Sequence, residues 1–141
     1  MTIAAPDLRV GNLMSIDPVV IAADAPAIEA ERLLKTYRVS GLPVVSDGVT
    51  TGVISQTDLE VARSSAIIHG TWERVLVRHL MTTPAVTVHI GTSLARAAQL
   101  MVTRHIHRLV VVDDEDAPIG VVSSLDLLRA LVKDPDIGPD A

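Results

Sequence analysis

Apolar residues in this chain recur with helical spacing in two places. One set lies at positions i, i+3, i+4 and i+7, which is one face of an α-helix: Ala30, Leu33, Leu34 and Tyr37. A second set has the same spacing: Leu94, Ala97, Ala98 and Met101. Pro26 suits the first turn of the first helix, and Thr92 or Ser93 can cap the second. The pattern therefore predicts two amphipathic helices of similar design.

Short β-prone runs precede and follow each predicted helix. Residues 19–21 and 86–88 lie before the helices, and the apolar runs 42–45 and 109–112 lie after them. A turn rich in Asp or Gly then leads to a further strand, at residues 52–55 and 119–123, and each block closes with a helix that starts near Asp58 or Asp126. The predicted order is strand, helix, strand, strand, helix, in a mixed α/β fold.

The two blocks form a sequence repeat. Residues 10–15 return as residues 77–82, an offset of 67, and the same offset relates Leu33 to Leu100. One extra residue in the second copy changes the offset to 68, which relates three further pairs: Gly52 and Gly120, Ser55 and Ser123, and Asp58 and Asp126. We predict one motif at residues 8–69 and another at 70–132, packed together about a pseudo-twofold axis. Residues 133–141 are expected to form an unpacked tail.

Composition excludes several classes of function. The chain has 141 residues, no cysteine and a net charge of −5, and no basic block attracts duplex nucleic acid. Tyr37 and Trp72 are its only aromatic residues, too few for a stacking platform that binds single strands. No apolar run approaches the roughly 20 residues needed to cross a bilayer, and the N-terminus lacks an export pattern. We therefore expect a cytoplasmic protein without a membrane partner.

A Ser-x-x-Asp element ends the last predicted strand of each motif. Ser55 with Asp58, and Ser123 with Asp126, fit a capping box, in which serine and acid satisfy the free N–H groups of a helix start. The same geometry suits a ligand, because a helix N-terminus binds phosphate and a carboxylate accepts hydrogen bonds from two ribose hydroxyls. Both interpretations stand at this point.

A basic cluster precedes the strand at residues 109–112. His105, His107 and Arg108 form a solvated turn, a pair of metal ligands or a phosphate-binding group. The metal hypothesis lacks a third ligand nearby in sequence, whereas the Arg108 guanidinium suits phosphate oxygens. The equivalent segment of the first motif, Ser40–Gly41, carries no cation, so we expect the two motifs to bind differently.

Taken together, these elements resemble a pair of CBS (cystathionine β-synthase) domains, the Bateman module. The resemblance covers residues 8–132 and rests on the repeat, the Met-x-x-x-Pro element at Met14–Pro18, the shorter element at Met81–Pro84, residues 42–45 and the two Gly-h-h-Ser-x-x-Asp elements. Residues 107–113 are similar to a nucleotide-binding segment of the γ subunit of AMP-activated protein kinase. Residues 40–43 resemble the corresponding segment of another repeat in that subunit.

The resemblance implies two ligand-binding sites, each with residues from both motifs. The first site would hold the phosphate and ribose with Ser55 and Asp58, the adenine with Ala85 and Val86, and the phosphates with His107 and Arg108. The second would comprise Pro18, Val19, Val20, Ser40, Gly41, Ser123 and Asp126. It implies no catalytic residue, no metal ligand and no obligatory cofactor.

The resemblance thus implies a non-enzymatic sensor that binds AMP, ADP or ATP and regulates an unidentified partner protein. Alternatives are a dimerisation scaffold without a ligand, and a module that responds to S-adenosylmethionine or to a metal. The closing helices, expected at residues 59–68 and 125–131, carry surplus apolar residues. Because CBS pairs commonly associate through such helices, we expect a homodimer.

Overall fold

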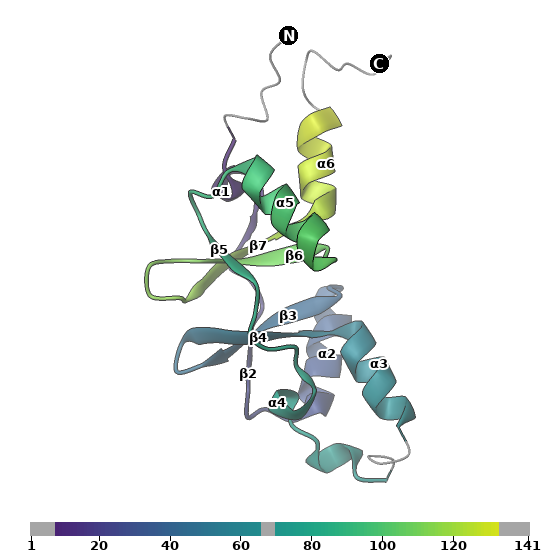
Figure 1. Ribbon diagram of the computed structural model, residues 1–141. Coiled ribbons are helices and arrows are strands. Elements are labelled where there is room, and N and C mark those ends of the chain that lie inside the picture. The colour runs from purple at the N-terminus through teal and green to yellow at the C-terminus, as the bar shows by residue number, and fades with distance from the viewer. Residues whose placement is uncertain (1–7, 66–69, 133–141) are drawn as a thin grey trace. The chain divides into compact units, whose positions relative to one another are not determined.

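The chain folds into two compact units, each with its own hydrophobic core. The structure, a computed structural model, describes residues 8–65 and 70–132 (Figure 1). Unit 1 consists of the described parts of Met1–Asp17, Val86–Glu115 and Ile119–Ala141, and unit 2 of those of Pro18–Ala85 and Asp116–Pro118. The predicted tail at residues 133–141 lies outside the described residues.

Unit 2 contains a three-stranded sheet with helices packed on it. Its elements in chain order are β2 (Ile21–Ala22), α2 (Ala27–Tyr37), β3 (Gly41–Ser46), β4 (Val49–Ser55), α3 (Gln56–Ser64), the 3-10 turn η2 (Trp72–Arg74) and α4 (Val77–Leu80). The strand order is β2-β3-β4, with β2 parallel and β4 antiparallel to β3. Ala30 and Leu34 of α2 pack into a core that includes Leu42, Val44 and Ile54.

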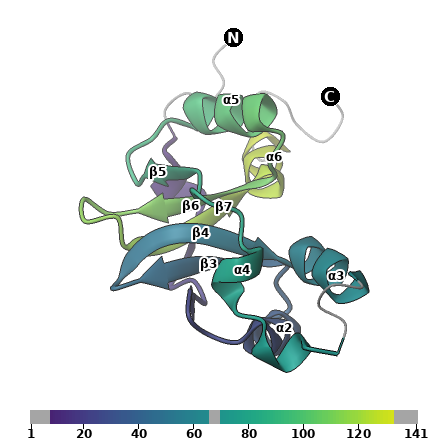
Figure 2. The same ribbon diagram turned by 60° about the horizontal axis from the view of Figure 1, so that its bottom comes forward.

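Unit 1 repeats this design with a four-stranded sheet (Figure 2). Its elements are α1 (Val10–Leu13), β1 (Ser15–Ile16), β5 (Thr87–His89), α5 (Leu94–Arg104), β6 (Arg108–Val112), β7 (Pro118–Ser123) and α6 (Ser124–Val132). The strand order is β1-β7-β6-β5. Ala97 and Met101 of α5 pack into a core with Leu109, Val111 and Val122. The predicted α/β class and the repeated order of elements are confirmed.

The opening segment of each sequence repeat completes the unit built mainly from the other repeat. The N–H groups of Val10 and Gly11 in α1 donate to the carbonyls of Thr92 and Ile90, just before α5. The N–H groups of Val77 and Arg78 in α4 donate in the same way to Ala25 and Ala23, just before α2. All four donor and acceptor positions differ by 67 residues. Sequence repeats and compact units therefore divide the chain differently.

The helices end and begin as local chemistry dictates, with small departures from the predictions. Ser93 caps α5 by accepting a hydrogen bond from Arg96 N at 3.1 Å, as predicted. The strand predicted at residues 19–21 starts only at Ile21. Tyr37 was expected on the buried face of α2 but is 55% exposed, because it is the last residue of that helix. Helix α3 ends at Ser64, and residues 67–68, expected to continue it, are outside the part of the chain that is described.

Candidate ligand-binding site

The Ser-x-x-Asp element of unit 2 forms a capping box at the start of α3. Ser55 is the N-cap residue, and its Oγ accepts a hydrogen bond from Asp58 N at 3.0 Å. In return, Asp58 Oδ2 accepts from Ser55 N at 2.9 Å. The helix begins at Gln56, two residues earlier than predicted, because capping places the acid in the first turn and not at the helix start.

Unit 1 contains the same box at the start of α6. Asp126 N donates to Ser123 Oγ at 3.1 Å, and Ser123 N donates to Asp126 Oδ2 at 2.8 Å. The copies differ in the second carboxylate oxygen: Asp126 Oδ1 lies 3.8 Å from the Arg129 guanidinium, whereas Asp58 has no ion pair in the described chain. The capping interpretation is thus confirmed for both aspartates. Each box uses one oxygen of its carboxylate, which leaves the second oxygen of Asp58 available to a ligand, whereas that of Asp126 lies near Arg129.

A short segment before the middle strand lies against each capping box. In unit 2, Gln56 N donates to the Ser40 carbonyl at 2.8 Å, and Gly41 is the register partner of Ser55. In unit 1, Ser124 N donates to the His107 carbonyl, also at 2.8 Å. Arg108, the first residue of β6, is half-buried, whereas His107 is exposed. In unit 1, the segment beside the start of α6 therefore carries a cation, Arg108. In unit 2, the segment beside the start of α3 is Ser40–Gly41, which is uncharged.

The predicted sites take residues from both units. Of the first predicted site, Ser55, Asp58 and Ala85 belong to unit 2, and Val86, His107 and Arg108 belong to unit 1. Of the second, Ser123 and Asp126 belong to unit 1, and the remaining residues belong to unit 2: Pro18, Val19, Val20, Ser40 and Gly41. Within unit 2, the fold brings the Ser55–Asp58 pair of the first predicted site next to Ser40 and Gly41 of the second. Unit 1 contains the converse combination. The complete sites stay predictions.

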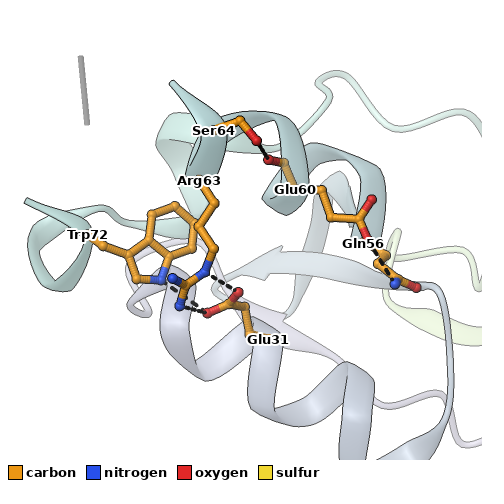
Figure 3. Close-up of polar contacts among 6 residues, drawn as sticks. All are labelled: Glu31, Gln56, Glu60, Arg63, Ser64 and Trp72. Atoms are coloured by element: carbon orange, nitrogen blue, oxygen red, sulfur yellow. Dashed lines mark hydrogen bonds and ion pairs between the residues drawn. The ribbon is translucent and has the colours of Figure 1, made fainter. Parts of the chain in front are cut away.

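Helices α2 and α3 of unit 2 enclose a pocket of about 490 Å³ that the sequence analysis missed. Ser40 and Gln56 lie in its lining, together with Glu31, Leu34, Lys35, Arg38, Val39, Leu59 and Glu60. Figure 3 shows two of its carboxylates, Glu31 on α2 and Glu60 on α3, the latter accepting a hydrogen bond from Gln56 Nε2 at 3.0 Å. The sequence signal was the i, i+3 spacing of Lys35 and Arg38 just before Ser40.

Glu31 is held by two partners at the edge of this pocket. Arg63 donates from Nε and a terminal nitrogen to the two carboxylate oxygens, at 2.8 and 3.0 Å, and Trp72 Nε1 donates to Oε1 at 3.0 Å (Figure 3). The Arg63 guanidinium also lies 4.9 Å from the centroid of the Trp72 ring. The hydrogen bonds from Arg63 lower the pKa of Glu31, against the opposing effect of burial, and Trp72 adds to the lowering. Glu31 is therefore a fixed negative charge whose partner is Arg63.

The structure gives no support to the metal hypothesis. In residues 8–65 and 70–132, no group of three or more His, Asp or Glu side chains is arranged to hold a metal ion. His89 Nδ1 lies 3.6 Å from Asp114, and His79 Nδ1 accepts a hydrogen bond from Leu76 N.

Among the helices of residues 8–65 and 70–132, none is long and apolar enough to cross a membrane.

Known proteins resemble this chain over most of its length. An uncharacterised protein of Methanocaldococcus jannaschii, MJ1426, is 30% identical across an alignment that covers 82% of this chain and 86% of that protein. Inosine-5'-monophosphate dehydrogenase of Helicobacter pylori is 29% identical over 117 residues, but this chain spans only 23% of that enzyme. The crystal structure of CBSX2 of Arabidopsis thaliana in complex with AMP superposes with a TM-score of 0.74 at 30% identity, covering 86% of this chain and 94% of that one.

The repeat seen in the sequence also matches a known family twice. The CBS domain family matches residues 10–64 and again residues 77–133, and each match contains one Ser-Asp capping box. The chain therefore belongs to the CBS domain family, of which it contains a pair of domains.

Proposed function

We propose that this chain is a non-enzymatic sensor that binds adenine nucleotides, AMP, ADP or ATP. The observation that carries the proposal is the paired Ser-Asp element at the starts of α3 and α6, where one carboxylate oxygen stays outside each capping box. The similarity of this chain to CBSX2, whose crystal structure contains AMP, supports the choice of an adenosyl ligand.

In this proposal each residue has a chemical role. Asp58 accepts hydrogen bonds from the ribose hydroxyls, and Ser55 and the start of α3 receive phosphate oxygens. Arg108 and His107 donate to the phosphates, and the backbone at Ala85 and Val86 contacts the adenine. The second site uses Asp126 and Ser123 in the same way, with Pro18, Val19, Val20, Ser40 and Gly41.

The proposal is tested by calorimetry with adenosine, AMP and ATP. Arg108→Ala is expected to weaken AMP and ATP binding roughly ten- to a hundredfold while changing adenosine binding little, because only the phosphates lose a charge-assisted partner. Equal losses for adenosine and ATP would show that Arg108 is structural. Arg96→Ala serves as the matched control, since it removes an exposed arginine of α5 that donates to Gln99 and belongs to neither predicted site.

The competing function is a dimerisation scaffold that needs no ligand. The favourable capping geometry fits that role too, since a capping box stabilises a helix without any nucleotide. A thermal-shift panel of AMP, ADP, ATP, S-adenosylmethionine and Zn²⁺ separates the two. A ligand at about 100 times its dissociation constant raises stability by about 2.7 kcal/mol, and a scaffold shows no shift with any of them.

A further inference from the structure

The pocket between α2 and α3 has two cations on one wall. Lys35 lies in the last turn of α2, and Arg38 is three positions further along the chain. Both residues are exposed and line the pocket. Neither side chain forms a hydrogen bond or ion pair within the described chain, and the positive charge of Lys35 adds to the lowering of the Glu31 pKa. Arg38 is the C-cap residue with φ of 54°, a left-handed conformation more usual for glycine. Arg38 contributes a cation to the pocket lining, and its equivalent in the other repeat, His105, is the C-cap of α5 with the same left-handed conformation, φ of 55°.

The opposite side of the pocket carries groups that accept hydrogen bonds. The carboxylate of Glu60 lies in the lining, with Gln56 beside it. The negative charge of Glu31 is already matched by Arg63, which reduces its repulsion toward an anion. The cations and Glu60 together suit a ligand with an anionic group at one end and hydroxyl or amine donors at the other. A volume of about 490 Å³ is within the range of small-molecule sites.

The two repeats differ in the number and position of their basic residues around this segment. Arg108 at the start of β6 corresponds by the 67-residue offset to Gly41, which has no side chain. Lys35 corresponds to Val102, which is 74% exposed. The second motif therefore has Arg108 at the strand start and Arg104 and His105 at the end of α5, whereas the first motif has Lys35 and Arg38 at the end of α2. Ser40 lines the pocket with them.

We propose that Lys35 and Arg38 bind the phosphate groups of a nucleotide in the α2–α3 pocket. The second predicted site, which contains Ser40, then also takes a phosphorylated ligand. This rests on the proposed function for the adenosyl part of the ligand. The earlier expectation that Ser40 and Gly41 meet no cation is replaced by a site whose cations come from the helix end.

Trp72 provides a local probe for this site, because it is the only tryptophan and donates to Glu31 in the pocket lining. Its fluorescence is titrated with AMP, adenosine and inorganic tripolyphosphate in three proteins. These are the wild type, the double variant Lys35→Gln/Arg38→Gln, and the control Arg32→Gln. Arg32 lies on the same helix but pairs with Glu29 outside the pocket lining. Calorimetry with AMP is repeated on the same three proteins carrying Arg108→Ala in addition. Because this substitution weakens the first predicted site, the measurement reports AMP binding at the α2–α3 pocket.

The expected result is at least tenfold weaker binding of AMP and tripolyphosphate to the double variant, with adenosine changed less than threefold and Arg32→Gln behaving as wild type. AMP binding within twofold of wild type in the double variant overturns the inference and leaves the proposed function standing. A change in Trp72 fluorescence with tripolyphosphate, but binding of neither AMP nor adenosine, overturns the proposed function. It also overturns the inference, because the pocket then binds inorganic polyphosphate and not a nucleotide. Circular dichroism confirms that each variant is folded.

Discussion

At the scale of single residues, Asp58 combines a structural role with a proposed binding role, and two substitutions separate them. Asp58→Ala removes the acceptor of Ser55 N and is expected to cost about 1 kcal/mol of unfolding free energy. Asp58→Asn keeps an acceptor oxygen for the box, so its loss of stability is smaller. Both variants are expected to bind AMP roughly ten- to a hundredfold more weakly, because neither has the charged acceptor for the ribose.

Calorimetry for binding and urea unfolding for stability are measured on the same preparations. Asp24→Asn is the matched control, since Asp24 is an exposed carboxylate that pairs with Arg78 and belongs to neither predicted site. If Asp58→Asn binds AMP within twofold of wild type, the carboxylate does not hold the ribose and its role is capping alone.

Glu31 is expected to make stability depend on acid pH. Its pKa in the folded chain is lowered from 4.5, chiefly by the hydrogen bonds from Arg63. A lowered pKa stabilises the fold above the unfolded value, and that stability is lost as the pH falls through the folded value. The melting temperature of Glu31→Gln should therefore fall less steeply than that of wild type below about pH 4.5.

Thermal melts followed by circular dichroism at a series of pH values measure this difference. Glu29→Gln is the control, because Glu29 pairs with Arg32 where the two side chains are 40% and 60% exposed and solvent screens the interaction. Parallel acid profiles for wild type and Glu31→Gln would show that the Arg63–Trp72 cluster does not couple to folding.

At the scale of elements, two glycines let the opening segments lie against the sheets. A Cβ atom at Gly52 in β4 would lie 2.7 Å from the carbonyl oxygen of Thr82, and one at Gly120 in β7 would lie 2.9 Å from that of Ser15. The neighbouring backbone is held in place, since Val53 and Thr82 exchange two hydrogen bonds of 3.0 and 2.9 Å. Gly52→Ala and Gly120→Ala should each cost about 1–3 kcal/mol through overpacking.

Urea denaturation measures the loss, with Gly91→Ala as the control. Nothing lies within 4 Å of a Cβ atom built at Gly91, so that variant should be as stable as wild type or slightly more stable. A Gly52→Ala variant as stable as Gly91→Ala would mean that the Thr82 segment moves away from β4 at little cost.

The helices and strands were predictable because their signals are local. The spacing of Ala30 and Leu34 identifies the buried face of α2, and both are buried. The same rule failed for Tyr37, since periodicity alone does not show where a helix leaves its core. The exchange of opening segments was not predictable either, because an offset of 67 is the same whether α4 packs within its own repeat or with the other.

The candidate site was predictable only in part. The Ser-x-x-Asp pattern gave the capping boxes directly, since the two residues that exchange hydrogen bonds, such as Ser55 and Asp58, lie only three positions apart in sequence. The pocket required knowing that Lys35 and Arg38 of α2 face Gln56 and Glu60 of α3, which depends on how two helices pack. No single-segment pattern contains that information.

At the scale of the whole molecule, exposed apolar side chains on α6 predict self-association. Leu125, Leu128 and Val132 lie on one helix face and are 51%, 56% and 71% exposed. Burying them against a second copy removes apolar surface from water, so we expect a homodimer of about 30 kDa, twice 15.0 kDa. Light scattering at micromolar concentration measures the mass.

The double variant Leu125→Glu/Leu128→Glu is expected to give a 15.0 kDa species, because charge on this face opposes burial. Val49→Glu is the control, since Val49 is 40% exposed on β4 of unit 2, whereas α6 belongs to unit 1. A wild-type mass of 15.0 kDa that does not change with concentration would contradict the dimer.

The exchange of opening segments sets an order for folding on the ribosome. Unit 2 is nearly complete once Ala85 has been synthesised, since it needs only Asp116–Pro118 in addition. Helix α1, in contrast, finds its partners at Ile90 and Thr92, so the whole of Pro18–Ala85 is made while Val10 and Leu13 have no core to enter. At about 5–20 residues per second this interval is roughly 3–14 seconds. The α1 segment is thus exposed to chaperones and proteases for longer than the segments of unit 2, although it is made before them.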